Sequence, residues 1–337
     1  MDNKEYIMNI EDLTVYYELE KETVKAINGV SLKLEKGKTL GLVGETGAGK
    51  TTLALSLLRL VPDPPGVIKK GRIEINGTDI LSLNKKAMEK VRGKEVSMIF
   101  QDPMTSLNPV LTVCDQIAES IAIHENVSKK EAEEKAIEML ELVGIPADRA
   151  YEYPHQFSGG MKQRVMISIA LACNPHLLIA DEPTTALDVT IQAQVLDLMA
   201  RLRDKYGTSV LMITHDLGVV AEICDEVAVM YAGSIVEQGT LEEVFENTKH
   251  PYTQGLFDSL PDVEDRKAEL KPIPGLMPDP TNLPVGCAFA PRCPYATEAC
   301  KAAPPSAHSF SDTHKVVCTA YDQPDFKLLK REDSYDG

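Results

Sequence analysis

The sequence lacks any apolar run long enough to cross a membrane as a helix, which takes roughly 20 residues. Its first residues, MDNKEYIMNI, also lack the basic region and apolar stretch of a secretion signal. We therefore expect a chain that is made in the cytosol and stays there. If the protein acts at a membrane, a partner must hold it there.

Positive charge is scarce, because 35 Lys and Arg residues face 51 Asp and Glu residues, for a formal net charge of −16. Such a surface repels the phosphates of nucleic acids and anionic lipid head groups, so we expect no nucleic-acid partner. The 337 residues suffice for one large domain or two modest ones. Apolar residues make up 43% of the chain, which supports a sizeable core.

Short apolar runs alternate with helical patterns, such as KTTLALSLLRLV at 50–61, over residues 1–250. This alternation predicts an α/β domain. Four of the runs are typical of strands buried on both faces. They are TLGLVG (39–44), VSMIF (96–100), LLIAD (177–181) and SVLMIT (209–214).

Two segments depart from this alternation. Residues 102–165 are typical of helices and loops, and we interpret them as a helical subdomain inserted into the α/β domain. Residues 251–337 contain many prolines, which disfavour long helices and central strands. We interpret them as a loop-rich C-terminal extension.

The segment GETGAGKT matches the phosphate-binding pattern G-x-x-x-x-G-K-[ST], between a predicted strand and a predicted helix. Its glycines let backbone N–H groups converge on phosphate oxygens at a helix N-terminus. Lys50 is predicted to reach the β- and γ-phosphates of ATP, and Thr51 to hold Mg²⁺. The flanking strand and helix disfavour the alternative of a glycine-rich turn without a ligand. The predicted ATP-binding residues are Gly44, Glu45, Thr46, Gly47, Ala48, Gly49, Lys50, Thr51 and Thr52.

The strand LLIADE ends in two adjacent carboxylates. Asp181 is predicted to bind the Mg²⁺, and Glu182 to orient and polarise the attacking water and take its proton. Strands that end in acids are common, and a surface acidic pair is the alternative. The pattern gains weight from the phosphate loop.

A second anion site is predicted in FSGGMKQR, at 157–164. Ser158 suits the N-cap of a helix that continues through residue 173. Ser158, Gly159 and Gly160 present hydroxyl and N–H donors at that helix N-terminus. One γ-phosphate does not need two such sites from one chain, so we predict a head-to-tail dimer with each ATP between two copies. An ordinary capped helix is the alternative.

With these motifs in this order, residues 5–250 resemble the ATPase of ATP-binding-cassette (ABC) transporters, a P-loop NTPase fold with a mixed sheet. The resemblance implies that Gln101 contacts Mg²⁺ or water and that His215 contacts the γ-phosphate. It also implies that Asp188, in Ala186-Leu187-Asp188, lies in the loop that contacts the opposite cassette.

Tyr17 matches the aromatic residue that stacks on adenine in this family. Two alternatives stay open. Tyr17 shares strand parity with Leu13 and Val15, which suits a core residue, and Tyr16 is an adjacent candidate for the stacking role.

The segments FQDPMTSLNP (100–109) and HPYTQGL (250–256), with the proline-rich end, resemble the ATPase subunits of dipeptide and oligopeptide importers. Close relatives in that group carry nickel instead. The resemblance implies two transmembrane permease subunits, a second ABC ATPase subunit that is identical or homologous, and indirectly an extracytoplasmic solute-binding protein. It places the chain at the cytoplasmic face of the cell membrane, driving peptide uptake by ATP hydrolysis.

Four cysteines, Cys287, Cys293, Cys300 and Cys318, crowd into the extension. A reducing cytosol disfavours disulfides, and the spacing lacks the tight pairs of zinc sites. Thiolates suit zinc or an iron–sulfur cluster, either of which would staple a segment without a core. The resemblance implies a [4Fe–4S] cluster, with Zn²⁺ and unligated thiols as the alternatives.

Two other functional classes fit the residues less well. A soluble ABC ATPase acting on ribosomes or DNA usually has two cassettes in one chain, or a long coiled coil between the phosphate loop and the segment that corresponds to FSGGMKQR. This chain has one cassette, and the interval from Thr51 to Ser158 is short and uneven. A non-hydrolysing scaffold would be expected to lack Glu182 or His215, and both are present.

Overall fold

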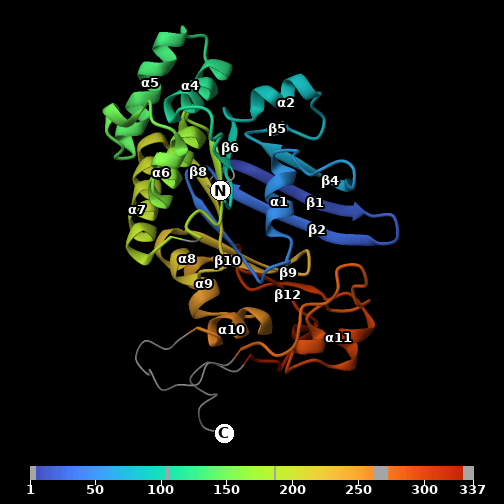
Figure 1. Ribbon diagram of the computed structural model, residues 1–337. Coiled ribbons are helices and arrows are strands. Elements are labelled where there is room, and N and C mark those ends of the chain that lie inside the picture. Colours follow the sequence, from blue (N-terminus) through green and yellow to red (C-terminus); the bar gives the residue numbers. More distant parts are fainter. Residues whose placement is uncertain (1–4, 103–105, 186, 261–271, 329–337) are drawn as a thin grey trace.

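The computed structural model describes residues 5–102, 106–185, 187–260 and 272–328, which form two β-sheets with helices around them (Figure 1). The smaller sheet is antiparallel, with the strand order β2-β1-β4-β5. Its strands are β1 (Tyr6–Glu18), β2 (Thr23–Glu35), β4 (Gly66–Ile75) and β5 (Thr78–Asp79).

The larger sheet has the strand order β11-β12-β10-β9-β3-β8-β7-β6. The five strands from β9 to β6 are parallel, whereas β10, β12 and β11 pair antiparallel at the other side. The strands are β3 (Thr39–Val43), β6 (Val96–Ile99), β7 (Leu177–Asp181), β8 (Ser209–Ile213), β9 (Glu226–Tyr231), β10 (Ser234–Thr240), β11 (Ala307–Ser309) and β12 (Lys315–Val317).

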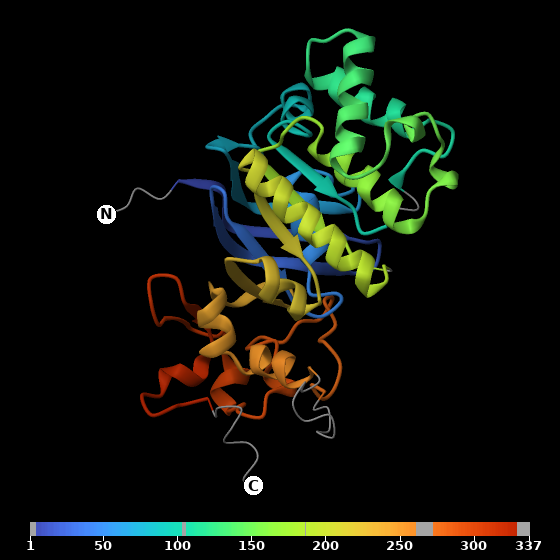
Figure 2. The same ribbon diagram turned by 90° about the vertical axis from the view of Figure 1, so that its left-hand side faces the viewer.

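The helices lie around the sheets and beyond both of their ends (Figure 1). Helices α4 and α5 lie at one end, and α10 and α11 lie at the opposite end in both views (Figures 1 and 2). The helices are α1 (Lys50–Leu57), α2 (Lys85–Val91), α4 (Val113–His124), α5 (Lys129–Leu142), α6 (Gly159–Leu171), α7 (Val189–Tyr206), α8 (Leu217–Ile223), α9 (Leu241–Glu246), α10 (Pro251–Asp258) and α11 (Glu298–Ala302). Short 3-10 turns occupy Ala147–Arg149, Pro154–Gln156, Ala290–Arg292 and Thr319–Asp322.

The parallel strands divide the interior into two apolar clusters, because successive side chains of a strand point to opposite faces. Leu177 and Ile179 of β7 face the smaller sheet and α1. Leu178 and Ala180 of the same strand face the cluster that the α4–α8 helices complete. Burial on both faces explains why these strands appear in the sequence as continuous apolar runs.

The four predicted strands are present within one residue of their predicted ends. Between β6 and β7 the described chain forms helices and 3-10 turns, although the division into subdomains at 102–165 and 250 stays an interpretation. The described residues after position 250 form the C-terminal segment. This segment adds β11 and β12 to the edge of the larger sheet, and neither strand was predicted from the sequence. Among the described residues, no helix is long and apolar enough to cross a membrane.

A buried carboxylate joins the C-terminal segment to the larger sheet. Glu237 of β10 has no exposed surface and accepts hydrogen bonds from the backbone N–H groups of Lys249 (2.7 Å) and His250 (2.9 Å). Its Oε1 also lies 2.8 Å from Nε2 of His314, which is buried beside it. A buried carboxylate is tolerated when its oxygens are matched in this way.

Replacing Glu237 with Gln should destabilise the protein, because an amide NH₂ would face N–H donors that now bind a carboxylate oxygen. We expect the free energy of unfolding to fall by roughly 3 kcal/mol, as when one partner of a buried pair is removed. Denaturant unfolding measures the change. Glu246→Gln, at an exposed position of α9, is the control, and equal stability of the two variants would contradict the role of Glu237.

Candidate functional site

Sequence-predicted site residues from four separate segments meet at the carboxyl ends of parallel strands. Gly44 follows β3, Gln101 follows β6, Glu182 follows β7 and His215 follows β8. The strands pair in register, with Leu42 opposite Ile213 and Ile99 opposite Ala180. Parallel strands that end together bring the residues after them to one edge of the sheet, where α/β folds bind ligands.

The phosphate loop has the backbone that its glycines predict. Gly44, Gly47 and Gly49 have φ angles of 152°, 85° and 108°, in a region that side chains disfavour. A Cβ on Gly44 would lie 2.2 Å from the carbonyl oxygen of Met230 in β9. The loop thus packs so closely on β9 that a side chain at Gly44 has no room.

Lys50 points back into this loop. Its Nζ donates hydrogen bonds to the carbonyl oxygens of Gly44 (2.6 Å) and Glu45 (3.2 Å). Burial lowers the pKa of Lys50, while the negative charges of Glu182, Asp181 and Glu45 act to raise it. The ammonium is therefore placed among acids, at the start of α1.

The two predicted Mg²⁺ ligands are neighbours. Asp181 is buried, and a hydrogen bond joins its side chain to that of Thr51. Burial raises the pKa of Asp181, and the Thr51 hydrogen bond and the charge of Lys50 oppose this rise. A hydroxyl and a carboxylate are oxygen donors of the kind that Mg²⁺ prefers.

Glu182 is the centre of a hydrogen-bonded group. Gln101 Nε2 and Thr185 Oγ1 donate to Glu182 Oε2 at 3.1 and 2.9 Å, and Nδ1 of His215 lies 3.2 Å from Oε1. Burial acts to raise the pKa of Glu182, but the Thr185 and His215 hydrogen bonds and nearby positive charge lower it overall. The carboxylate is thus held ionised and oriented.

Tyr17 is half-buried on β1, whereas Leu13 and Val15 of the same strand are fully buried. Its hydroxyl lies 3.2 Å from Oγ1 of Thr52, the residue after the phosphate loop. The ring therefore borders the loop, although the half-buried Tyr16 is still an alternative for stacking on adenine.

The predicted second anion site lies at the start of α6, where this helix packs against α7. Ser158 caps α6 and accepts a hydrogen bond from the N–H of Met161 at 3.4 Å, and Asp188 caps α7. A Cβ on Gly160 would lie 2.6 Å from a side-chain atom of Ile191 in α7. These contacts do not join Ser158, Gly159, Gly160 or Asp188 to the Glu182 group. Ala186, predicted to contact the opposite cassette, lies outside the described residues.

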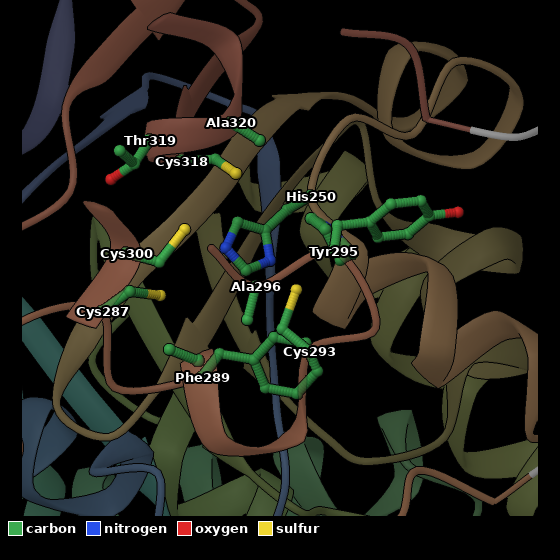
Figure 3. A pocket seen from close by; sticks show the side chains of 12 residues that line it. His250, Cys287, Phe289, Cys293, Tyr295, Ala296, Cys300, Cys318, Thr319 and Ala320 are labelled. Carbon is green, nitrogen blue, oxygen red and sulfur yellow. The ribbon is translucent and has the colours of Figure 1, made fainter. Parts of the chain in front are cut away.

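The four C-terminal cysteines line one pocket with His250, and their sulfur atoms turn toward a common space (Figure 3). Burial raises the pKa of Cys293 to about 11 and that of Cys318 to about 12, so both are neutral thiols at pH 7. Within the described ranges, no three His, Cys, Asp or Glu side chains are arranged to hold a metal ion. The pocket therefore gathers sulfur donors without forming a closed metal site.

Three residues that contact the site were not singled out in the sequence. Thr185 binds Glu182, while Arg292 and Tyr252 bind Glu45 of the phosphate loop. Arg292 is 247 positions from Glu45. Arg292 directly precedes Cys293, which draws attention to it in the sequence, but no local pattern connects Arg292 with the phosphate loop.

Known protein families match both parts of the chain. The ABC transporter family matches residues 27–185, and the oligopeptide/dipeptide transporter C-terminal region matches residues 236–300. The chain is 52% identical over 313 residues to the oligopeptide transport ATP-binding protein OppD of Bacillus subtilis, covering 92% of this chain and 87% of that one. It is 48% identical over 321 residues to the dipeptide transport ATP-binding protein DppD of the same organism, covering 95% and 96%.

Solved structures resemble the fold. The dimeric structure of the ATP-binding cassette MJ0796, in a post-hydrolysis state bound to ADP and Pi, matches with a TM-score of 0.63 and 26% identity. The match covers 69% of this chain and 98% of that one. The structure of cbiO1 from Clostridium perfringens, part of the ABC transporter complex cbiONQ, matches with a TM-score of 0.62 and 28% identity, covering 72% and 92%. The predicted fold class is confirmed.

Replacing Gly44 with Ala should destabilise the protein, because the new Cβ meets the backbone of β9. We expect the free energy of unfolding to fall by about 3 kcal/mol, the upper range for overpacking a tight site. Gly37→Ala is the matched control. Gly37 also has a positive φ, of 73°, but nothing lies within 4 Å of the place that a Cβ would take, so the cost should be about 1 kcal/mol. Equal losses in denaturant unfolding would contradict the packing argument.

Proposed function

The chain belongs to the ATP-binding subunits of oligopeptide and dipeptide ABC importers, and on that premise we propose that it hydrolyses MgATP between two cassettes to drive peptide uptake. The predictions of this family and of an ATPase are confirmed. One observation carries the proposed mechanism: Glu182, held by Gln101, Thr185 and His215, lies at the strand end beside Asp181.

In the proposed site the phosphate loop binds the triphosphate through its backbone N–H groups and Lys50. Lys50 would exchange the carbonyl oxygens of Gly44 and Glu45 for phosphate oxygens. Thr51 and Asp181 would hold Mg²⁺, which supplies charge neutralisation on the phosphate oxygens when bound. A hydrogen bond already joins the side chains of these two residues.

Glu182 would act on the attacking water. Its lowered pKa keeps it ionised, so that it can accept a hydrogen bond from the water and take its proton as the water oxygen bonds to the γ-phosphorus. The bond from that phosphorus to the ADP oxygen breaks in the same displacement. Gln101 and Thr185 fix the carboxylate, and His215 is placed to contact the γ-phosphate.

The remaining donors would come from a second cassette. Ser158, Gly159 and Gly160 are exposed or half-buried at the start of α6 and are not joined to the Glu182 group of their own chain. A head-to-tail dimer would bring them, with Asp188, to the partner's ATP. The dimeric form of the similar cassette MJ0796 supports this arrangement. We propose that closing and reopening of the dimer moves the membrane subunits.

We infer that two permease subunits hold the chain at the cytoplasmic face of the membrane, with a second ATPase subunit that is identical or homologous. A solute-binding protein would act indirectly, through the permease. The match of residues 236–300 to the peptide-importer C-terminal region favours peptides over nickel as the solute, and favours an importer over a soluble ABC ATPase acting on ribosomes or DNA.

We also propose that the cysteine pocket binds a [4Fe–4S] cluster, with Zn²⁺ as the alternative. The support is chemical: Cys300 of α11 and three thiols from outside the helices and strands line one pocket together with His250 (Figure 3). Burial raises the pKa of Cys293 and Cys318, and the described residues form no closed metal site, so binding would require deprotonation of these two thiols and convergence of the four side chains.

Glu182→Gln tests the catalytic proposal. The amide cannot take a proton, so hydrolysis should slow by roughly 10²- to 10⁴-fold while MgATP binding is retained. Phosphate release and equilibrium binding of MgATP measure the two effects. Glu138→Gln, at an exposed position of α5, should leave both unchanged. Turnover of Glu182→Gln near that of the wild type would rule out this role.

The metal proposal is tested on protein purified without oxygen. We expect visible absorption with matching amounts of iron and acid-labile sulfide, and loss of all three in Cys287→Ser. Cys173→Ser is the control, because Cys173 lies outside the pocket, where its thiol donates a hydrogen bond to the carbonyl oxygen of Ser120. Colourless protein containing zinc would select the alternative, and protein without metal would leave the thiols unligated; the ATPase proposal stands in both cases.

A further inference from the structure

An ion pair joins the C-terminal segment to the phosphate loop. Arg292 lies at the end of the 3-10 turn Ala290–Arg292, directly before Cys293. Its Nη1 and Nη2 donate to the two carboxylate oxygens of Glu45 at 2.7 and 2.9 Å, in the fork geometry that Arg forms with carboxylates. The Arg292 side chain is 5% exposed and that of Glu45 is 30% exposed, so water screens the pair weakly.

The guanidinium is fixed by further contacts. Nε of Arg292 donates to the carbonyl oxygen of Pro274 at 2.8 Å, and Nη2 to that of Ile273 at 3.4 Å. Nη1 also donates to the Tyr231 hydroxyl at 3.3 Å. These partners are neutral, and Glu45 supplies the negative charge. Arg292 is therefore held in place by contacts that do not involve the phosphate loop.

Glu45 is held at three points. Its carboxylate binds Arg292, its N–H donates to the hydroxyl of Tyr252 in α10 at 2.9 Å, and its carbonyl oxygen accepts from Lys50. Two of these three contacts are made by residues after position 250, Arg292 and Tyr252. The conformation of the first turn of the phosphate loop thus depends on the C-terminal segment.

The charge of Glu45 makes this dependence matter for ATP. A carboxylate beside a triphosphate repels it, and the repulsion is strong where the surroundings are partly buried. A bidentate ion pair with Arg292 offsets this charge. We propose that Arg292 is a positioning residue of the ATP site, which neutralises Glu45 and fixes the first turn of the phosphate loop for binding of the triphosphate. This inference rests on the proposed ATP-binding function.

The affinity of the full chain for MgATP tests the inference through a double-mutant cycle. Arg292→Gln leaves Glu45 unpaired and should weaken binding roughly 5- to 150-fold, the usual range of coupling between sites. In a Glu45→Gln background the same Arg292→Gln change should have less than about a threefold effect, because no carboxylate is left to repel phosphate. The change should appear in KM for ATP more than in kcat, since the Glu182 group is untouched.

Arg201→Gln is the matched control, because it removes an exposed Arg–Asp pair on α7 far along the chain from the loop. If Arg292→Gln does not fold, as judged by thermal unfolding, Arg292→Lys is used in both backgrounds; it keeps the charge but loses the fork, and should weaken binding less. Equal affinity of wild type and Arg292 variants overturns the inference, as does the same loss with and without Glu45. Failure of the wild type itself to bind MgATP would instead overturn the proposed function.

Discussion

The in-register parallel pairing of β3, β8, β7 and β6 is the constraint on which the site depends. Leu42 pairs with Ile213, Ile213 with Asp181, and Ala180 with Ile99, so the four strands end at one level. Directly beyond this level lie the phosphate loop, Glu182, His215 and Gln101, which follow β3, β7, β8 and β6 in the chain. A slip of one residue in a strand would turn its side chains to the opposite face and separate these groups.

The same ladder explains how Glu182 keeps an unusual backbone. Its φ is 47°, in the left-handed region that costs a residue with a side chain about 1–3 kcal/mol. Its N–H donates to the carbonyl oxygen of Ile213 at 2.8 Å, which continues the pairing of β7 with β8 by one residue. The hydrogen bond and the buried strands beneath it hold the turn, and the turn directs the carboxylate toward Gln101, Thr185 and His215.

The C-terminal segment both extends the larger sheet and contacts the phosphate loop. β12 extends the larger sheet, Glu237 ties β10 to Lys249, His250 and His314, and Arg292 reaches the phosphate loop. One residue that lines the cysteine pocket, Cys293, directly follows Arg292.

The sequence by itself determined the four parallel strands β3, β6, β7 and β8, the phosphate loop and the position of Asp181 and Glu182, because buried parallel strands are continuous apolar runs and the pattern of the loop is local. It also indicated the family, since its motifs occur in order. Tertiary structure alone decided that Arg292 and Tyr252 bind Glu45 and that β12 extends the sheet. Each of these contacts joins segments whose spacing carries no periodic or motif signal, so the partner is chosen by packing in three dimensions and not by neighbouring residues.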